Sequence, residues 1–546
     1  MDKILFIVPP NIKYNDFVSP DFNVQTVSRK SGKFGSIRTE MPLGVLSMSA
    51  YVKKYTIVKT KLIDFNIVLT KLKSFEFHSF LGLFRSFLSD SKLVNYAPNI
   101  IGISTLFSTA YQNMLDIAQC CRDIFPSAVV TAGGGVPTNM YNDIFENSVC
   151  FDALCYGEGE KPLLGLVEAN NKMQYFEENP SWITPKKVEN KQQFRYDFIE
   201  NLDEIPFYDF NILKPSEYDF NPTIITYHAI YEKEQSFPIM TSRGCPHHCC
   251  FCSSHTIHGR KVRYYSLSRV REDLRRLKDQ YGAKTIVFQD DHFMAKRQRV
   301  LEILNMIKDL QIGVFFQNAL TMYALDRKML EALKSAGVNL LVLSAESGSD
   351  RVLREIMHKP INLSIIKQVV NDCRELGIYA DLNIMIGLPG ETKQDIEDTR
   401  NFLKTINANW IRMSIAAPLV GTEMLSICLK KNYLKGSYLD CNFKKAIVET
   451  EDFTAEYIQE KAYALNLELN FVENGDFRLG NYEVALKGFE NAIRAKNDHA
   501  IAYYYAAKCY EKLGNLEKAQ QYMSIAKVNA EKPFWRKYTD MFNIFL

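Results

Sequence analysis

Four cysteines lie within one short segment of the chain. The segment "RGCPHHCCFCSS", residues 243–254, contains Cys245, Cys249, Cys250 and Cys252. Thiols this close together can form a disulfide knot, a zinc site or an iron–sulfur cluster. The three outer members follow the pattern C-x3-C-x2-C, and Cys250 lies inside it. The rest of the chain has to discriminate between these three chemistries.

The chain gives little support to disulfides. Its start, "MDKILFIVPP", has one lysine and an apolar run that is too short for a signal peptide and lacks a small-residue cleavage site. No stretch approaches the roughly 18 uninterrupted apolar residues of a membrane-spanning helix. We therefore expect a cytoplasmic protein without a membrane span, in which thiols stay reduced. The net charge of +3 in 546 residues gives no reason to expect a nucleic-acid partner.

Zinc remains open on residue types alone. Cys249 and Cys252 form a C-x2-C pair, and two further ligands could come from the nearby histidines. These histidines are His247, His248, His255 and His258. The alternative to an enzyme is therefore a zinc-stapled scaffold that binds a partner protein.

Residues 1–170 alternate strand and helix patterns. Continuous apolar runs between amphipathic segments are typical of a parallel sheet covered by helices on both faces. We predict a Rossmann-like (flavodoxin-like) domain, whose ligand would bind at the carboxyl ends of the strands. The expected strands are residues 3–8, 60–65, 99–105, 128–134 and 151–157. Residues 171–235 do not continue the alternation of strand and helix patterns, and their prolines and polar residues predict a linker.

A second alternation runs from residue 236 to 430. Six strand–helix units predict a partial (β/α)6 barrel of the TIM type, which makes the chain an α/β multidomain protein. The cysteine segment follows the first of these strands, at the end where such barrels carry their active sites. The expected strands are residues 237–241, 285–289, 313–317, 340–344, 381–387 and 410–416. Residues 431–454 are expected to be a connector.

Residues 455–546 are expected to form an all-helical tail. The segment "LGNYEVALKGFENAI" begins at Leu479 and "LGNLEKAQQYMSIAK" begins at Leu513, an offset of 34 residues. This is the period of the tetratricopeptide (TPR) repeat, a pair of antiparallel helices. The apolar face of residues 532–546 suits a helix that caps such an array.

The C-x3-C-x2-C pattern after the first strand of a six-unit barrel resembles the radical S-adenosylmethionine (SAM) superfamily. The resemblance covers about residues 237–425. It implies that Cys245, Cys249 and Cys252 bind a [4Fe-4S] cluster, whose fourth iron stays open for SAM. It also implies cleavage of SAM to a 5'-deoxyadenosyl radical that modifies a substrate. Cys250 has no counterpart and is interpreted as a bystander.

The same resemblance implies SAM contacts at the ends of later barrel strands. "VFQDDHF" supplies two acids for the amino group of SAM, although a helix N-cap explains them equally well. "SAESGSD", "MHKPIN" and "IMIGLPGET" supply an acid, a base and a glycine loop. The expected SAM-binding residues are Asp290, Asp291, Glu346, Ser347, Lys359, Gly387 and Gly390.

The front domain resembles the cobalamin-binding domain that precedes many radical SAM barrels. The resemblance rests on the motifs "VPPN", "MPLGVLSMSAYV", "TAGGG" and "YGEGEKPL", in that order. It implies that Gly133 and Gly134 let a strand end approach cobalamin. A tight turn is an equally good explanation of these glycines.

Together these patterns predict a radical SAM enzyme, with cobalamin-dependent methyl transfer as its reaction. A cobalamin-independent radical cyclase or oxidoreductase stays open. The expected partners are a small-molecule or peptidyl substrate, an electron donor such as flavodoxin or ferredoxin, and a protein bound by the tail. The sequence assigns neither the catalytic residue nor the substrate.

Overall fold

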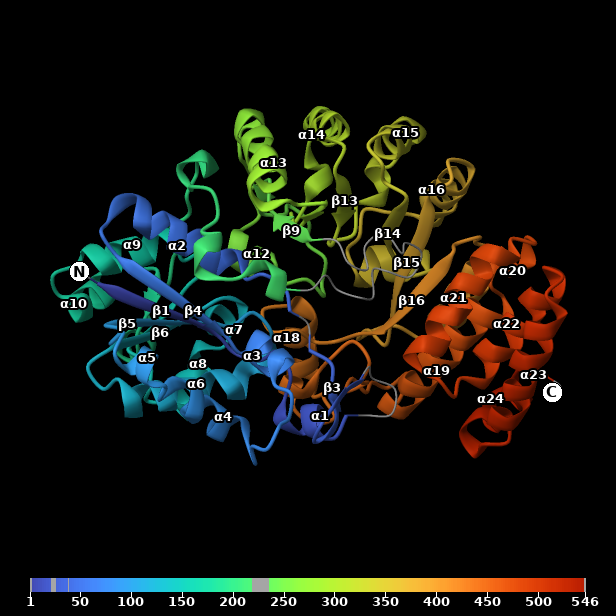
Figure 1. Ribbon diagram of the computed structural model, residues 1–546, viewed down its shortest axis with the longest axis horizontal. Coiled ribbons are helices and arrows are strands. Elements are labelled where there is room, and N and C mark those ends of the chain that lie inside the picture. The colour runs from blue at the N-terminus through green and yellow to red at the C-terminus, as the bar shows by residue number, and fades with distance from the viewer. Residues whose placement is uncertain (1, 21–25, 38, 219–234, 545–546) are drawn as a thin grey trace.

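The computed structural model describes residues 2–20, 26–37, 39–218 and 235–544. Figure 1 shows three regions along the longest axis: an α/β region at the N-terminal end, a central arc of strands and helices, and a helical C-terminal region. The protein is therefore of mixed α/β class. Within the described residues, no helix is both long and apolar enough to cross a membrane.

The front region is built on a six-stranded sheet with the order β4-β1-β5-β6-β7-β8. The first five of these strands are parallel, and β8 runs antiparallel to β7. The strand order reverses between β1 and β5, the position where open α/β sheets bind ligands. The strands are β1 (Lys3–Val8), β4 (Lys59–Asp64), β5 (Ile100–Ser104), β6 (Val129–Gly133), β7 (Ala153–Cys155) and β8 (Trp182–Ile183).

Helices cover both faces of this sheet, as the apolar strands predict. Leu5 and Ile7 of β1 face one buried core, and Ile4 and Phe6 face the other. The first core contains side chains of α3 (Phe65–Lys71), α4 (Phe80–Leu88), α6 (Tyr111–Ile124) and α8 (Tyr141–Asn147). The second contains side chains of α2 (Leu43–Tyr55), α9 (Glu160–Glu168) and α10 (Lys172–Glu178).

Part of the predicted linker folds into helices and a short strand that pack in the front region. Strand β8 pairs with β7, and the buried Trp182 packs against Phe176 of α10 with a centroid distance of 4.9 Å. The Lys187 ammonium of α11 (Pro185–Glu189) donates to three backbone carbonyls of this segment. The linker prediction therefore fails for residues 172–189, because a two-residue strand shows no periodicity. Residues 219–234 of the predicted linker lie outside the described residues.

Six parallel strands frame the central region in the part of the chain that the structure describes. β9, β12 and β13 form one parallel sheet, β14, β15 and β16 form another, and a parallel bridge between Leu320 and Leu343 links the two. The strands are β9 (Ser236–Ile239), β12 (Thr285–Phe288), β13 (Gly313–Phe316), β14 (Leu340–Glu346), β15 (Tyr379–Ile386) and β16 (Trp410–Ile415). All six match predicted strands.

The central helices follow their strands one by one. Figure 1 shows the first four fanned along the outer side of the strands. The helices are α13 (Leu267–Tyr281), α14 (Arg297–Leu310), α15 (Arg327–Ser335), α16 (Leu363–Glu375), α17 (Lys393–Lys404) and α18 (Glu423–Lys431). One buried cluster joins the central strands to Leu46 of α2 and to Ile458 and Leu465 of α19, so the three regions share a core.

The C-terminal region is helical, as predicted. It contains α19 (Ala455–Leu467), a π-helical turn at Glu468–Val472, α20 (Gly475–Arg478), α21 (Tyr482–Ala495), α22 (Ala500–Lys512), α23 (Leu516–Ala530) and α24 (Pro533–Met541). Trp535 of α24 is fully buried and its ring lies 4.4 Å from that of His499. The terminal apolar face therefore packs within the helical region.

The helical region also covers the free edge of β16. Asn470 accepts from the Ile411 N–H at 2.7 Å and donates to the Ile411 carbonyl at 2.7 Å. Its side-chain amide thus makes the hydrogen bonds that a neighbouring strand would make. Such pairing matters because the unpaired backbone groups of an edge strand can bind another chain. Asp476 is bound to Arg374 at 2.8 Å close by.

Replacing Asn470 by Ala should lower the free energy of unfolding by about 1–3 kcal/mol, because it leaves two buried backbone groups unpaired. Chemical denaturation measures this loss. Asn497→Ala, at an exposed position of the same region, is the matched control. An equal stability for both variants would show that the amide does not cover the edge.

Candidate active site

The cysteine segment is closed at its base by a short ladder. β10 (Ser242–Arg243) and β11 (Arg263–Tyr264) pair antiparallel on either side of it. Within the loop, the Cys245 N–H donates to the Gly259 carbonyl at 3.2 Å, and the Cys252 N–H donates to the Cys249 carbonyl at 3.1 Å. The segment is therefore an anchored loop after β9.

Three of the four thiols lie near one another and are partly exposed. Cys245, Cys249 and Cys252 are half-buried and free of disulfides. Burial raises the pKa of Cys245 to about 11, and the other two thiols add to the rise. Burial also raises the pKa of Cys249, whereas the Lys359 ammonium lowers it. A positive neighbour favours the thiolate, the form that binds metal.

Cys250 belongs to the core instead. Its side chain is 4% exposed and lies in the buried cluster of the central region. Its N–H donates to the Met357 carbonyl, and its carbonyl accepts from the Met424 N–H. Burial raises the pKa of this thiol to about 12. The buried side chain places Cys250 in the core, and the bystander interpretation stays a prediction.

The number of donors beside the three thiols bears on the zinc alternative. Within the part of the chain that the structure describes, no three His, Cys, Asp or Glu side chains converge as a mononuclear metal site requires. Zinc needs four ligands about 2.0–2.3 Å from one ion. A four-iron cube binds each thiolate at a different iron and so spaces the sulfurs more widely. Cys245, Cys249 and Cys252 are free, partly exposed thiols that are available as its three ligands.

Glu346 and Lys359 lie beside this cluster of thiols. Lys359 Nζ is 3.2 Å from Glu346 Oε1 and 3.3 Å from the Ser344 carbonyl. The charges of both side chains act on the Cys249 thiol. Glu346 is 8% exposed and has a φ of 65°, a left-handed conformation that is costly for a residue other than glycine. Such strain at a strand end is typical of functional sites.

Ser347, in contrast, holds the end of β14 against α17. Its side chain is fully buried and shares a hydrogen bond of 3.1 Å with Thr399. The same hydroxyl of Thr399 accepts from the Gly348 N–H at 3.0 Å. These contacts give Ser347 a structural position next to Glu346 and leave its predicted SAM contact without support.

The two acids after β12 have different surroundings. Asp290 is 2% exposed, and its carboxylate accepts from the N–H and hydroxyl of Thr241 and from the hydroxyl of Ser242. Burial raises its pKa. Asp291 accepts from the Gly244 N–H at 2.8 Å, beside Cys245. Asp290 therefore ties β12 to β9, and only Asp291 reaches the cysteine segment.

The glycine loop after β15 is tightly held. Gly387 has a φ of 90°, and a Cβ there would lie 2.8 Å from Ile458 of α19. Gly390 has a φ of 88°, and a Cβ there would make only an ordinary contact, 3.7 Å from Ile356. Glu391 is fully buried and accepts from the N–H groups of Gly387 and Leu388. Burial raises the pKa of Glu391 to about 8, so this carboxyl is mostly protonated at pH 7.

At the front sheet, Gly134 is required by a close backbone approach. It has a φ of 104°, and a Cβ there would lie 2.6 Å from the Thr105 carbonyl. A Cβ on Gly133 would meet only an ordinary contact, 3.5 Å from Cys155. The close approach favours the tight turn at Gly134, whereas the contact at Gly133 supports neither explanation over the other.

The same sheet edge nevertheless has features that fit a large ligand. The Thr105 hydroxyl is buried and without a hydrogen-bond partner within the described residues. The next two residues, Leu106 and Phe107, are 59% and 50% exposed although apolar. They follow β5 at the switch point of the sheet. An unpaired hydroxyl beside two exposed apolar side chains suits a ligand with polar and apolar parts.

The sequence analysis did not identify a cluster of polar side chains in the cysteine segment and in the segments that follow β12 and β13. His247 Nε2 lies 3.1 Å from the Tyr323 hydroxyl, and His292 Nδ1 lies 3.1 Å from the Thr321 hydroxyl. Burial lowers the pKa of His292 to about 4, so its ring is neutral at pH 7. These side chains can exchange hydrogen bonds with a substrate near the thiols. Only His247, within the cysteine segment, had a signal in the sequence.

A second polar row crosses from the front region to these strands. Gln289 donates to Gln317 at 2.8 Å, and Gln317 donates to Glu40 at 2.9 Å. Gln289 and Gln317 directly follow the neighbouring strands β12 and β13. No motif marks these residues, because their proximity depends on the packing of two regions.

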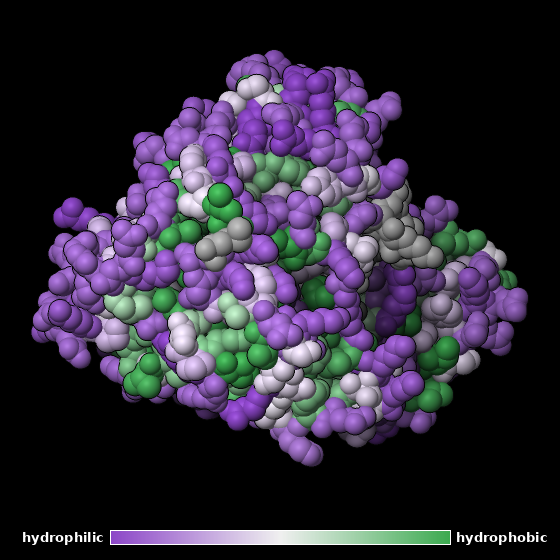
Figure 2. Space-filling model, turned by 60° about the vertical axis from the view of Figure 1, so that its left-hand side comes forward, coloured by the Kyte–Doolittle hydropathy of each residue, from purple (hydrophilic) through white to green (hydrophobic). Residues whose placement is uncertain are grey.

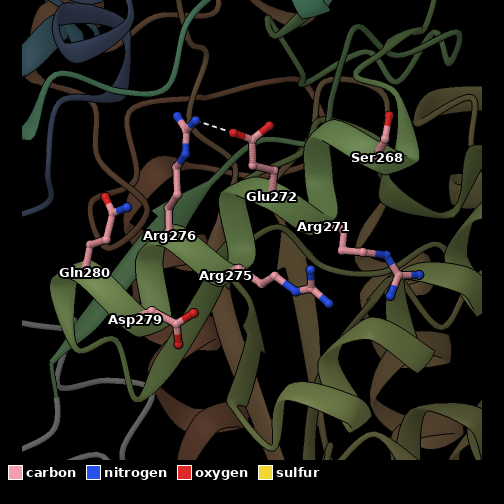
Figure 3. A pocket seen from close by; sticks show the side chains of 7 residues that line it. All are labelled: Ser268, Arg271, Glu272, Arg275, Arg276, Asp279 and Gln280. Atoms are coloured by element: carbon pink, nitrogen blue, oxygen red, sulfur yellow. Dashed lines mark hydrogen bonds and ion pairs between the residues drawn. The ribbon is translucent and has the colours of Figure 1, made fainter.

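Two surface features complete the description. Figure 2 shows a mostly hydrophilic face that is hollowed near its centre, with hydrophobic residues in the recess. A separate hollow, shown in Figure 3, lies along α13. Its lining residues are Ser268, Arg271, Glu272, Arg275, Arg276, Asp279 and Gln280. All belong to one helix, and one helix surface cannot enclose a ligand.

The sequence matches two known domain families. The Radical SAM superfamily matches residues 239–403, and the B12 binding domain matches residues 88–167. The first match spans the cysteine segment and the central strands through β15. The second spans the front sheet from β5 to α9, including the edge at Thr105.

Relatives over most of the chain are named as methyltransferases. An uncharacterized methyltransferase of Pyrococcus horikoshii is 29% identical over 381 residues, which are 67% of this chain and 78% of the relative. The cytidylyl-2-hydroxyethylphosphonate methyltransferase of Streptomyces wedmorensis is 26% identical over 70% of this chain and 78% of its own length.

Solved structures share the fold. The radical SAM methyltransferase TsrM from Kitasatospora setae, with cobalamin and a [4Fe-4S] cluster bound, has a TM-score of 0.56 at 13% identity, over 80% of this chain and 76% of its own. The cobalamin-dependent SAM radical enzyme OxsB has a TM-score of 0.61 at 14% identity, over 100% of this chain and 84% of its own.

The chain is therefore a radical SAM enzyme that carries a B12-binding domain. These domains imply a [4Fe-4S] cluster, SAM and cobalamin as its cofactors. A radical SAM enzyme also needs a substrate and a reductant. The alternative of a zinc-stapled scaffold is set aside.

Replacing Cys245, Cys249 or Cys252 by Ala should abolish cluster assembly, because each change removes one iron ligand. Cys250→Ala is the matched control and should keep the cluster, since that thiol lies in the core. Iron and sulfide analysis of anaerobically reconstituted protein checks this. Loss of iron in Cys250→Ala at unchanged folding would contradict the assignment.

Glu346→Gln should keep the cluster and weaken SAM binding by about 1–3 kcal/mol, the scale of a lost charged hydrogen bond. Titration calorimetry with SAM measures the change. Glu355→Gln, which alters an exposed acid nine residues away, should bind SAM as the unmodified protein does. Equal affinities for both variants would remove Glu346 from the site.

Proposed function

We propose that the protein transfers a methyl group from SAM to its substrate with the help of cobalamin. The observation that carries this proposal is the presence of both domains in one chain, together with relatives named as methyltransferases over two thirds of it. When bound, the cluster supplies electrons for SAM cleavage and cobalamin supplies methyl transfer. The chain itself must hold both groups near one substrate.

Cobalamin is proposed to lie at the carboxyl edge of the front sheet. The unpaired Thr105 hydroxyl and the exposed Leu106 and Phe107 support this position. SAM is proposed to lie between Asp291, Glu346, Lys359 and the glycine loop with Gly387 and Gly390. The proximity of Glu346, Lys359 and Cys249 supports the SAM position.

The six central strands are proposed to form a partial (β/α)6 barrel. Their chain order, their parallel pairing and the bridge from Leu320, beyond β13, to Leu343 of β14 support this architecture. Its carboxyl end would enclose the substrate, and a flavodoxin or ferredoxin would supply electrons.

The C-terminal helices are proposed to be a tetratricopeptide array that binds a protein or peptidyl substrate. The starts of α21 and α23, at Tyr482 and Leu516, recur at the repeat offset of 34 residues. The contacts of Asn470 and Asp476 with the central region support a structural role beside this one.

A second candidate is a radical cyclisation. The anaerobic magnesium-protoporphyrin IX monomethyl ester cyclase of Rubrivivax gelatinosus is 24% identical over 58% of this chain and 57% of its own length. Transfer of a labelled methyl group from SAM to product separates the two candidates, because a cyclisation leaves the label on SAM-derived products.

Reconstitution with hydroxocobalamin should give corrin absorbance that comigrates with the protein in gel filtration. Phe107→Asp should weaken this binding by about 1.5–3 kcal/mol, the value of one buried aromatic side chain. Val149→Asp, at a residue that is 95% exposed, is the control and should retain cobalamin. Without comigrating corrin in the unmodified protein, methyl transfer loses its support.

A further inference from the structure

A buried ion-pair network joins the front region to the base of the cysteine segment. Glu158 Oε1 lies 2.6 Å from Arg263 Nη2 and 2.9 Å from His258 Nδ1, and Glu158 Oε2 lies 3.3 Å from Arg243 Nη1. Arg243 Nη2 lies 2.7 Å from Glu160 Oε1. The two acids and two arginines are at most 5% exposed. Both acids lie in the "YGEGEKPL" segment after β7.

The basic partners of Glu158 all stand at the base of the cysteine loop. Arg243 of β10 and Arg263 of β11 are direct partners in the ladder that closes the loop. Arg243 is followed at once by Gly244 and Cys245. His258 precedes Gly259, whose carbonyl accepts from the Cys245 N–H. One carboxylate of the front region therefore contacts the loop base at three points.

We propose that Glu158 and Glu160 are positioning residues that hold the cysteine segment in its cluster-binding conformation. The Arg243 guanidinium bridges both carboxylates with different nitrogens, a geometry that lysine cannot reproduce. The bridge fixes the direction in which the chain enters Cys245. Because both acids follow a strand of the front sheet, it also sets the distance between that sheet and the three thiols.

The network is poorly suited to stability alone. Four charges are removed from water, and such networks often stabilise no more than apolar residues of similar volume. The Nε atoms of Arg243 and Arg263 are buried without hydrogen-bond partners among the described residues. The geometry of the network instead suits a role in holding the cysteine loop in one conformation. This inference rests on the proposed assignment of Cys245, Cys249 and Cys252 as cluster ligands.

The test compares Glu158→Gln and Arg243→Lys with the unmodified full-length protein. Glu158→Gln keeps the shape of the side chain but removes its negative charge. Arg243→Lys keeps the positive charge but removes the guanidinium that bridges the two carboxylates with different nitrogens. In cluster-free protein, both should speed backbone amide exchange in residues 244–259. After reconstitution, both should lose iron to a chelator about 10–100-fold faster, the usual effect of residues that support metal ligands.

Asp476→Asn is the matched control. Asp476 is 1% exposed, pairs with Arg374 at 2.8 Å and joins the helical region to the central one. Its replacement should lower the thermal midpoint but leave loop exchange and iron retention unchanged. If Glu158→Gln does not fold, Ser47→Ala replaces it in the test. This change removes the hydrogen bonds of Ser47 to Glu160 at 2.6 Å and to Arg243 at 3.3 Å, and it should increase loop exchange.

Two outcomes distinguish a failure of the cluster-ligand assignment from a failure of the positioning proposal. If the unmodified protein assembles no cluster, the ligand assignment is wrong. The second outcome applies if the unmodified protein assembles a cluster. If Glu158→Gln and Arg243→Lys then show the same loop exchange and iron retention as Asp476→Asn, at a similar loss of thermal stability, the positioning role is overturned. The network is then only an interface between the two regions.

Discussion

The arrangement of the molecule depends on the burial of Glu158 between Arg243 and Arg263. Burial alone would raise the pKa of this carboxyl, but Arg243, His258 and Arg263 hold it well below its usual range. Removing one partner of such a buried pair typically costs about 3–5 kcal/mol, because the other charge is left uncompensated. The front sheet and the cysteine segment are therefore bound to one geometry. Burial alone would lower the pKa of His258, but Asp291 and Glu158 raise it above its usual value.

A fixed relation between these regions matters for chemistry with two large cofactors. The cysteine segment presents the thiols, and the edge at Thr105 presents an unpaired hydroxyl and two exposed apolar side chains. Reacting groups must lie within a few ångströms of one another, and small displacements cost much of the rate. The polar row of Glu40, Gln317 and Gln289 is a second contact between the same regions.

The sequence predicts the strands well because they are parallel and buried on both faces. The inner strands give apolar runs, and the predicted strand at residues 3–8 coincides with β1 (Lys3–Val8). The edge strand β4 is more polar and more exposed. Cysteine spacing likewise identifies the three neighbouring thiols, because their pattern is local. β8 escapes detection because it has two residues, and its register depends on β7. The offset of 34 residues between the two similar tail segments is visible in the sequence, whereas the attachment of Asn470 to β16 is not.

The candidate site is less predictable, because strand ends place acids by packing rather than by pattern. Asp290 and Asp291 are neighbours in one motif, yet Asp290 ties β12 to β9 and Asp291 contacts the cysteine segment. The Glu158–Arg243 pair joins residues 85 positions apart, and no local signal connects them. Motif matching finds which segments gather at a site. Only the packing decides which member of each motif faces it.

The glycine loop shows how the third region takes part in the same site. Ile458 of α19 lies against Gly387, and a side chain at that glycine would displace it. The carboxyl of Glu391 binds the N–H groups of Gly387 and Leu388, and burial keeps it mostly protonated at pH 7. A neutral carboxyl avoids the cost of a buried charge while it fixes the loop. The helical region thus stands directly behind a segment expected to contact SAM, so its attachment to β16 supports the site as well as the strand edge.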